Sequence, residues 1–144
     1  MNKILGFTML FIVFLAGCTT MSQETQEDKM IPEHAKTAIF AGGCFWCMEA
    51  PFEAENGVLD VVAGYVGGSE ETANYQDVSR GTTQHREGIR VIYDPNIVSY
   101  ERLVEIYFWQ IDPSDPDGQF ADKGFHYTTA IYYYDDEQKQ IAQK

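Results

Sequence analysis

Two cysteines that enclose two aromatic residues, Cys44-Phe45-Trp46-Cys47, form the most reactive pattern in this 144-residue sequence. A cysteine thiolate is a nucleophile that can also be oxidised and reduced again. Large, flat, apolar side chains beside a reactive sulfur suit a substrate with a small, apolar, polarizable group. The alternative interpretation is core packing, because buried cysteines and aromatic side chains are common in protein interiors.

The elements around this pattern favour catalysis over core packing. Residues 37–41 have the small and apolar composition of a short buried strand, and Gly42-Gly43 permits a sharp turn after it. Cys44 then stands where a helix over residues 45–55 should begin. Unpaired backbone N–H groups and the positive end of the helix dipole favour a thiolate at such a position. Pro51 argues against a fully regular helix through this range.

The segment GGCFWCMEAPFE resembles the active-site motif of the peptide methionine sulfoxide reductase A family, in which GCFW is followed closely by Glu. Because further motifs recur in the expected order, the resemblance extends from Thr37 to the end of the sequence. It implies a two-layer α/β (α+β) sandwich, a ferredoxin-like mixed sheet with helices packed on it. It also implies reduction of methionine S-sulfoxide, free or in proteins, to methionine through a sulfenic acid on Cys44. No bound cofactor and no metal are implied, and the external reductant would be a thioredoxin-like protein or a dithiol.

That reaction needs a nucleophile, an acid for the departing oxygen and an apolar cage for the S-methyl group. Cys44 suits the first role, and Phe45 and Trp46 suit the cage. The resemblance implies that Glu87 is the proton donor, whereas by itself Glu87 would be interpreted as one half of an exposed salt bridge at a strand end. Arg86 adds a positive charge that could hold Glu87 ionised, unless strand alternation turns the two side chains to opposite faces.

Three further residues match family positions around the substrate. The resemblance implies that Tyr75 and Tyr127 hydrogen-bond the substrate oxygen and that Asp122 helps to form the pocket. By composition alone, each tyrosine would be a core residue, since the chain has nine, and Asp122 would cap a loop. Glu49 matches the motif glutamate, which we expect to be a structural support near Cys44 and not a catalytic group. His126 stands where the family often has Gln and is assigned no role.

Cys47 is a candidate resolving thiol, because its CxxC spacing would allow it to attack a sulfenic acid on Cys44. The usual resolving cysteines of the family lie further towards the C-terminus and are missing from this sequence. Whether Cys47 resolves Cys44 or is a buried structural thiol stays open on the sequence. Family members usually continue for several tens of residues, so we expect that the C-terminal part of the domain is missing here.

Residues 1–17 have the features of a lipoprotein signal peptide. Lys3 supplies the charged start, and residues 4–15 are an apolar run that is too short for a comfortable membrane span. The ending Leu-Ala-Gly-Cys resembles a bacterial lipobox, in which Cys18 would carry the lipid. We therefore expect an extracytoplasmic lipoprotein that is anchored to the membrane. An ordinary cleaved signal peptide and a plain N-terminal anchor are the alternatives.

After the anchor, residues 18–36 are expected to form a polar tether and residues 37–144 a single reductase domain. The chain has 10 Lys and Arg against 22 Asp and Glu, a formal net charge of −12, which argues against nucleic acid as a partner. We expect a monomer. A zinc site is disfavoured because the cysteine pair, His85 and His126 lack ligand spacing.

The rest of the sequence predicts elements that position these residues. Strands are predicted over 58–66, 88–94 and 125–134, helices over 100–111 and 135–144, and a single helical turn over 75–79. Residues 112–124 form a long Pro/Gly/Asp loop, a kind that is often functional in compact domains. The resulting order, β-α-β-β-α-β-α, is typical of a two-layer α/β domain.

Two other functions fit part of the pattern. A thioredoxin-like dithiol oxidoreductase also uses CxxC at a strand–helix junction, but its intervening residues are usually small or Pro and it has no use for Glu87 or the two tyrosines. A non-enzymatic surface lipoprotein could bind peptides in an aromatic groove, and an unreactive Cys44 would favour that interpretation.

Overall fold

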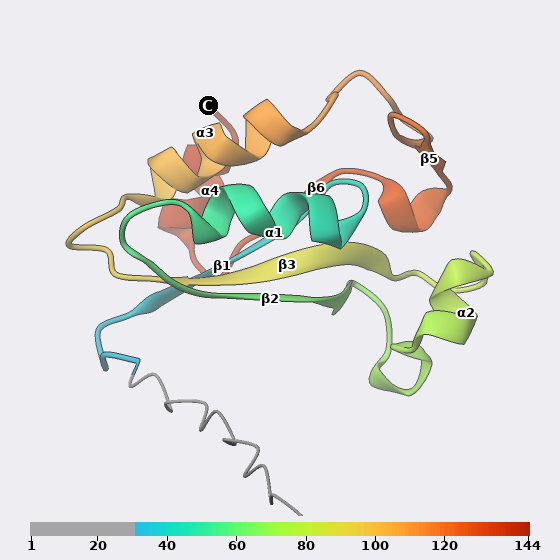
Figure 1. Ribbon diagram of the computed structural model, residues 1–144, viewed down its shortest axis with the longest axis horizontal. Coiled ribbons are helices and arrows are strands. Elements are labelled where there is room, and N and C mark those ends of the chain that lie inside the picture. The colour runs from blue at the N-terminus through green and yellow to red at the C-terminus, as the bar shows by residue number, and fades with distance from the viewer. Residues whose placement is uncertain (1–30) are drawn as a thin grey trace, which may run out of the picture.

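Four strands from distant parts of the chain form the sheet of the computed structural model, which describes residues 31–144 (Figure 1). They are β1 (Lys36–Ala41), β2 (Val58–Val66), β3 (Arg86–Tyr93) and β6 (Ala130–Tyr132). Their order in the sheet is β2-β3-β1-β6, and every pairing is antiparallel.

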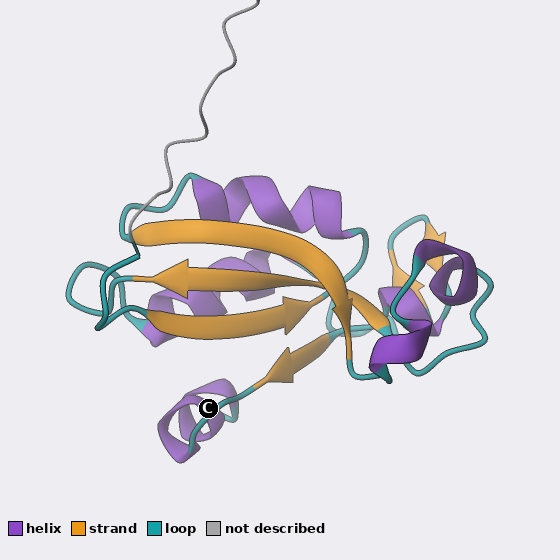
Figure 2. Ribbon diagram, turned by 90° about the horizontal axis from the view of Figure 1, so that it is seen from below, coloured by secondary structure: helices purple, strands orange, loops and turns teal. Residues whose placement is uncertain are grey.

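Helices cover one face of this sheet. The α-helices are α1 (Phe45–Glu53), α2 (Tyr75–Ser79), α3 (Tyr100–Gln110) and α4 (Asp136–Ala142), and the 3-10 turns are η1 (Glu70–Thr72) and η2 (Phe125–Tyr127). A separate hairpin joins β4 (Gly118–Gln119) to β5 (Asp122–Lys123). Helices α1 and α3 lie over the same face (Figure 1), and no described helix covers the opposite face (Figure 2). The predicted two-layer α/β sandwich is thus confirmed.

The strand order is the ferredoxin-like arrangement, but the sheet is antiparallel where a mixed sheet was expected. Each β-α-β unit places its two parallel strands one position apart, and an antiparallel strand from the other unit fills the gap. Parallel neighbours therefore never meet.

Alternation along β3 decides which side chains reach the helices. Glu87, Ile89, Val91 and Tyr93 are buried at every second position, while Arg90 is exposed on the open face. The core between the layers is aromatic at its centre. There the Phe40 ring stacks on Phe52, Tyr107 and Tyr100, with centroids 5.3, 5.2 and 6.1 Å away.

The predicted strand over 125–134 is wrong in its first half. Phe125–Tyr127 is a 3-10 turn, and only Ala130–Tyr132 pairs in the sheet. Gly124 precedes the turn with φ +124°, a conformation that the sequence pattern does not reveal. The Tyr127 carbonyl then accepts a hydrogen bond from the Gly43 N–H (3.1 Å), so this segment is folded against the turn before α1.

Two smaller predictions also need correction. Residues 58–66 form the expected strand, but it is only half-buried because β2 is an edge strand with one open face. Strand β3 begins at Arg86 and not at Gly88, so Glu87 lies inside the sheet. The predicted helices over 100–111 and 135–144 are confirmed as α3 and α4.

Side chains cap the N-terminal ends of helices α3 and α4. The Ser99 hydroxyl accepts from the Arg102 N–H (3.2 Å), and the Asp135 carboxylate accepts from the Gln138 N–H (2.8 Å). The amide of Gln138 reaches further, since its oxygen accepts from the Tyr134 N–H (2.9 Å) and its nitrogen donates to the Thr37 carbonyl (2.8 Å). Gln138 therefore joins α4 to β1.

The expectations for the N-terminus fall mainly outside the described residues. These are the signal peptide over residues 1–17, Cys18 as a lipid attachment site, and most of the tether over residues 18–36. The last tether residue, Lys36, is already part of β1. Among residues 31–144, no helix is long and apolar enough to cross a membrane.

Tyr107 joins the neighbouring strands β1 and β6 close to the turn that precedes α1. Its hydroxyl donates to the Ala41 carbonyl (2.9 Å), and the backbone of Ala130 and the side chain of Thr129 also bond it. Ala41 and Ala130 are register partners in β1 and β6. Burial raises the pKa of Tyr107, so the hydroxyl stays protonated and remains a donor.

Replacing Tyr107 by Phe (Y107F) should lower the free energy of unfolding by about 1–2 kcal/mol, because the ring still packs but the Ala41 carbonyl loses a buried donor. Urea denaturation would measure the change. Phe108→Leu on the same helix is the control. Phe108 is 46% exposed, so its replacement should lower the free energy of unfolding by less. Equal losses in the two variants would contradict the importance of the hydroxyl.

Candidate active site

Two glycines make the turn that presents Cys44. Gly43 has φ +89°, which favours glycine, and a Cβ there would lie 3.0 Å from the Gln119 Cβ. A Cβ on Gly42 would lie 2.6 Å from Ile111 Cγ2. The chain can therefore turn this sharply and this close to α3 only without side chains. Cys44 follows as the N-cap residue of α1, at the helix start that the sequence predicted. It is half-buried.

Glu87 lies beneath the first turn of α1. Its Oε2 accepts a hydrogen bond from the Phe45 N–H (3.3 Å), one of the unpaired donors at the helix start, and its side chain is only 5% exposed. Burial raises the pKa of Glu87, the Phe45 hydrogen bond partly opposes that rise, and the negative charge of Asp122 adds to it. With its pKa raised in this way, the Glu87 carboxyl keeps its proton to a higher pH than an exposed glutamate does.

Arg86 points to the opposite face of the sheet. Its Nε donates to Thr128 Oγ1 (2.8 Å), its Nη1 donates to the Tyr132 hydroxyl (3.2 Å), and its guanidinium lies 4.3 Å from the centroid of the Phe125 ring. The alternation expected for adjacent strand residues is confirmed, so Arg86 does not hold Glu87 ionised. The interpretation of Glu87 as an exposed salt-bridge partner is wrong, because it is buried.

Tyr127 and Asp122 complete one side of the site. The pKa of Tyr127 is raised by burial and then by the negative charges of Glu87, Asp122 and Cys44, which places all three near the phenol. The hydroxyl therefore stays protonated and can donate a hydrogen bond. Asp122 comes from β5 and is half-buried.

Tyr75 is exposed at the start of α2, with 71% of its surface accessible, so the interpretation as a core residue is wrong for it. Its phenol is near enough to raise the pKa values of both Tyr65 and Tyr127. The helix carrying it is capped by Asn74, whose side chain accepts from the Asp77 N–H (3.1 Å). Figure 1 shows α2, β5 and the first turn of α1 at the same end of the molecule.

Three aromatic rings form a wall next to Cys44. Phe45 stacks on Trp46, with centroids 5.9 Å apart and an angle of 25° between the planes, and it also contacts Tyr65 at 5.9 Å. Trp46 is 75% exposed. A large exposed ring beside a cysteine is available for contact with a substrate.

Tyr65 is the site residue that sequence reasoning missed. It is the register partner of Glu87 in the β2–β3 pairing, so the two side chains lie on the same face. Burial raises the pKa of Tyr65, and the charges of Glu87 and Tyr75 raise it further. Strand alternation in residues 58–66 indicates on which face of the strand Tyr65 lies. Only the pairing register with β3 reveals that Glu87 is its neighbour.

The Cys47 thiol is exposed, so the interpretation as a buried structural thiol is wrong. Partial desolvation raises its pKa, and the negative charge of Cys44 and a side-chain hydrogen bond with Cys44 raise it further. Cys47 therefore keeps its proton to a higher pH than an ordinary thiol and lies near Cys44. Glu49, two residues further along, accepts from the Ala63 N–H (3.1 Å) and ties α1 to β2.

The arrangement combines a nucleophile, a proton donor and hydroxyl donors around one point. Cys44 can attack, Glu87 can protonate, and Tyr75 and Tyr127 can donate to an oxygen. Such a set suits attack on an atom that bears a polarised oxygen, with protonation of that oxygen as it leaves. Among the described residues, no three or more His, Cys, Asp or Glu side chains gather as a metal site.

Comparison with known proteins gives a consistent family. The family described as peptide methionine sulfoxide reductase matches residues 36–144. Peptide methionine sulfoxide reductase MsrA of Bacillus velezensis is 52% identical over 111 residues, 77% of this chain and 63% of that protein. The Listeria monocytogenes protein of the same name is 48% identical over 115 residues, 80% of this chain and 65% of that protein. This chain thus spans less than two thirds of the length of these curated relatives.

Two solved structures share the fold. Methionine sulfoxide reductase A of Corynebacterium diphtheriae superposes with a TM-score of 0.71 at 28% identity, covering 78% of this chain and 56% of that chain. Mxr1 from Saccharomyces cerevisiae in reduced form gives a TM-score of 0.72 at 27% identity, covering 78% and 67%.

Replacing Glu87 by Gln (E87Q) should stabilise the protein at high pH. The pKa of Glu87 is higher in the folded protein than in the unfolded chain, where it is about 4.3. The protonated carboxyl therefore contributes its full stability below that unfolded-state pKa, and this contribution is lost as the pH rises through the folded-state pKa. Glutamine never ionises and can still accept from the Phe45 N–H. At pH 8 we expect Tm to rise by roughly 2–6 °C, the size of change that about 1 kcal/mol produces in a domain of this length.

Below pH 4 the difference between E87Q and the unmodified protein should vanish. Thermal melts across pH 3.5–8 would measure it. Glu53→Gln is the control, because Glu53 is an exposed carboxylate of α1, the helix that lies over Glu87. This variant reports how much Tm rises merely because the net negative charge falls by one. A Tm gain in E87Q that does not grow with pH, or that equals the gain in the control, would argue against a buried, raised-pKa carboxyl.

Proposed function

The chain belongs to the peptide methionine sulfoxide reductase family, and we propose that it reduces the S epimer of methionine sulfoxide, free or in proteins, to methionine. The observation that supports this most directly is the buried Glu87 carboxyl bonded to the Phe45 N–H, one residue from Cys44. It places a proton source beside a nucleophile, which is what cleavage of an S–O bond requires.

The first step forms a bond between the Cys44 sulfur and the substrate sulfur. The thiolate supplies the electron pair for this bond while the sulfoxide oxygen is protonated. The hydroxyl group so formed then passes from the substrate sulfur to the Cys44 sulfur. The S–O bond and the bond between the two sulfurs both break, and the electron pair of the sulfur–sulfur bond returns to the substrate sulfur. The products are methionine and a sulfenic acid on Cys44. The substrate sulfur gains two electrons, and the Cys44 sulfur loses them.

The departing oxygen must be protonated, since oxide is a very poor leaving group. Glu87 supplies this proton, because burial keeps its carboxyl protonated at a pH where an exposed glutamate would be ionised. Tyr127 keeps its hydroxyl proton and, with Tyr75, donates hydrogen bonds to the same oxygen. Asp122 supports this side of the pocket and adds to the raised pKa of Glu87.

The aromatic wall selects the methyl end of the substrate. Phe45 and Trp46 offer flat apolar surfaces for the S-methyl group, and contacts between sulfur and aromatic rings contribute about 0.3–1.5 kcal/mol. A sulfoxide has three different substituents at sulfur. With the methyl against the rings and the oxygen towards Glu87, only one epimer directs the remaining chain out of the site.

Cys47 is the resolving thiol of this proposal. Its thiol lies close enough to Cys44 for that side chain to raise the pKa of Cys47. Attack of Cys47 on the sulfenic acid forms a disulfide and releases water. A thioredoxin-like protein or a small dithiol then reduces the disulfide, which balances the two electrons given to the substrate.

For the cell, we propose an extracytoplasmic protein repair enzyme that counters oxidative damage. The charged start, short apolar run and Leu-Ala-Gly-Cys ending of residues 1–18 support a signal peptide and a lipid anchor at Cys18. We also propose that it acts as a monomer.

Cys44→Ser should abolish sulfoxide reduction, and E87Q should lower kcat/KM by about 10²–10⁴, the usual contribution of a positioned general acid. The assay is dithiothreitol-dependent turnover of the separated S and R epimers of a methionine sulfoxide peptide. Only the S epimer should react. Glu49→Gln is the matched control, because an amide oxygen can still accept from the Ala63 N–H and activity should survive.

Full activity in E87Q, or equal turnover of the two epimers, would refute the assigned roles. Reduction of insulin disulfides without any sulfoxide turnover would instead identify a thioredoxin-like dithiol oxidoreductase.

A single turnover without reductant should test Cys47. The unmodified protein should release one equivalent of methionine and form a disulfide within the 44–47 peptide, as detected by mass spectrometry. Cys47→Ser should release the same methionine but leave a sulfenic acid on Cys44 that dimedone labels. Cys18→Ser should behave like the unmodified protein. A persistent sulfenic acid in the unmodified protein would exclude Cys47 as the resolving thiol.

A further inference from the structure

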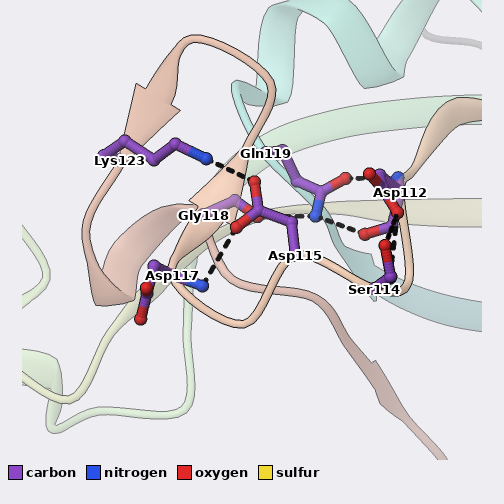
Figure 3. A network of polar contacts seen from close by, with 7 residues as sticks. All are labelled: Asp112, Ser114, Asp115, Asp117, Gly118, Gln119 and Lys123. Carbon is purple, nitrogen blue, oxygen red and sulfur yellow. Dashed lines mark hydrogen bonds and ion pairs between the residues drawn. The ribbon is translucent and has the colours of Figure 1, made fainter.

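Gln119, in the long loop over residues 112–124, is a polar residue with only 1% of its surface exposed. Its Oε1 accepts from the Asp112 N–H (2.6 Å), and its Nε2 donates to the Asp112 carbonyl (2.9 Å), as Figure 3 shows. The same Nε2 also donates to the Gly118 carbonyl (2.5 Å). One side chain thus pairs both backbone groups of Asp112, as a neighbouring strand would.

The aliphatic part of Gln119 lies against the turn that presents Cys44. A Cβ on Gly43 would be 3.0 Å from the Gln119 Cβ and 3.4 Å from its Cγ. Gly43 immediately precedes Cys44, and its positive φ fixes the direction in which the chain enters α1. A shift of Gln119 would therefore move or loosen this turn.

The backbone of Gln119 also sets the position of Asp122. The two are direct register partners in the β4–β5 hairpin. Each strand of that hairpin has only two residues, so its own ladder is a weak support. Phe120, at its tip, is held at φ +53°, a conformation that an aromatic residue adopts only when its surroundings impose it.

Figure 3 also shows an ion pair that links this hairpin to the preceding part of the loop, and it lies at the surface. The Lys123 ammonium pairs with the Asp115 carboxylate, but the Lys123 side chain is 56% exposed, and exposed ion pairs contribute little. The Gln119 amide is buried, so its hydrogen bonds compete less with water than the Lys123–Asp115 ion pair does. The buried amide therefore holds the hairpin more firmly than the ion pair does.

From these contacts we infer that Gln119 is a positioning residue. Its amide ties the hairpin that carries Asp122 to the backbone of Asp112, its aliphatic part lies against Gly43, and together these contacts fix Asp122 relative to Cys44. It touches no substrate in this role. The effect on sulfoxide reduction rests on the proposed function, whereas the effect on the turn before Cys44 does not.

The chain offers a matched control in Gln138. This residue is also buried, at 4% exposure, and its amide also clamps backbone, through the Tyr134 N–H and the Thr37 carbonyl. It joins α4 to the beginning of β1, away from the turn at the end of that strand. Loss of either amide should therefore cost stability, but only loss of Gln119 should disturb the site.

The experiment compares Gln119→Met with Gln138→Met in the full 144-residue chain. Methionine is unbranched and close in length, so packing is retained while the amide is lost. With both variants folded, Gln119→Met should lower kcat/KM for the S epimer about 10–100-fold, mainly in kcat, since a misplacement of about 1 Å can cost 10²-fold. Gln138→Met should stay within about twofold of the unmodified protein, within the range expected for sites that do not interact.

Amide hydrogen exchange tests the positioning without any sulfoxide. The Gly43 N–H donates to the Tyr127 carbonyl (3.1 Å), so it reports directly on the turn. In Gln119→Met its exchange should quicken at least tenfold relative to the core amides of β3, and in Gln138→Met it should change only as much as they do. If the unmodified protein reduces no sulfoxide, the proposed function fails, but this measurement still decides the role of Gln119.

Unchanged kcat/KM and unchanged Gly43 exchange in Gln119→Met would overturn the inference. Parallel losses of activity in both variants would overturn it as well, since they would indicate general destabilisation. If Gln119→Met does not fold, Gln119→Glu replaces it, because a carboxylate can still accept from the Asp112 N–H but cannot donate to its carbonyl. It should give a smaller loss in the same two measurements, and normal values in both would contradict the inference.

Discussion

The site depends on burying one carboxyl, Glu87, beneath the N-terminus of a helix. Removing a carboxylate from water is costly, and within residues 31–144 the Phe45 N–H is the one group that donates a hydrogen bond to Glu87. The protonated form is therefore favoured, which is the form that an acid catalyst needs. The helix start that supplies the Phe45 N–H also presents Cys44, so a single structural feature serves both the proton donor and the nucleophile.

The surrounding structure maintains this arrangement. Antiparallel pairing to β2 places Tyr65 beside Glu87, and alternation along β3 sends Arg86 to the other face, where Thr128 and Tyr132 bind it. A cation on the helix-facing side would favour the carboxylate and remove the acid. The alternation of side chains along β3 thus keeps Arg86 away from Glu87, its neighbour in sequence. On the same face, Arg86 would favour the ionised form of Glu87.

The turn before Cys44 is where the constraints meet. Gly43 donates to the Tyr127 carbonyl and lies against Gln119, while Tyr107 bonds the carbonyl of Ala41 just before it. Residues from the end of α3, the β4–β5 hairpin and η2 therefore converge on two glycines. This convergence explains why the long loop over residues 112–124 is ordered around a buried amide, although most of its side chains are exposed.

The sequence by itself determined the elements and the nature of the chemistry. The Gly-Gly-Cys junction, the caps at Ser99 and Asp135 and the alternation in residues 88–94 are local signals, since each depends on neighbours within a few residues. The motif around Cys44 likewise indicated a thiol reaction and its family. Tertiary structure decided what depends on partners far along the chain: the burial of Glu87, the pairing of Tyr65 with it, the exposed thiol of Cys47 and the 3-10 turn at Phe125–Tyr127. Desolvation and strand register arise only when distant segments pack together, which is why local patterns could not supply them.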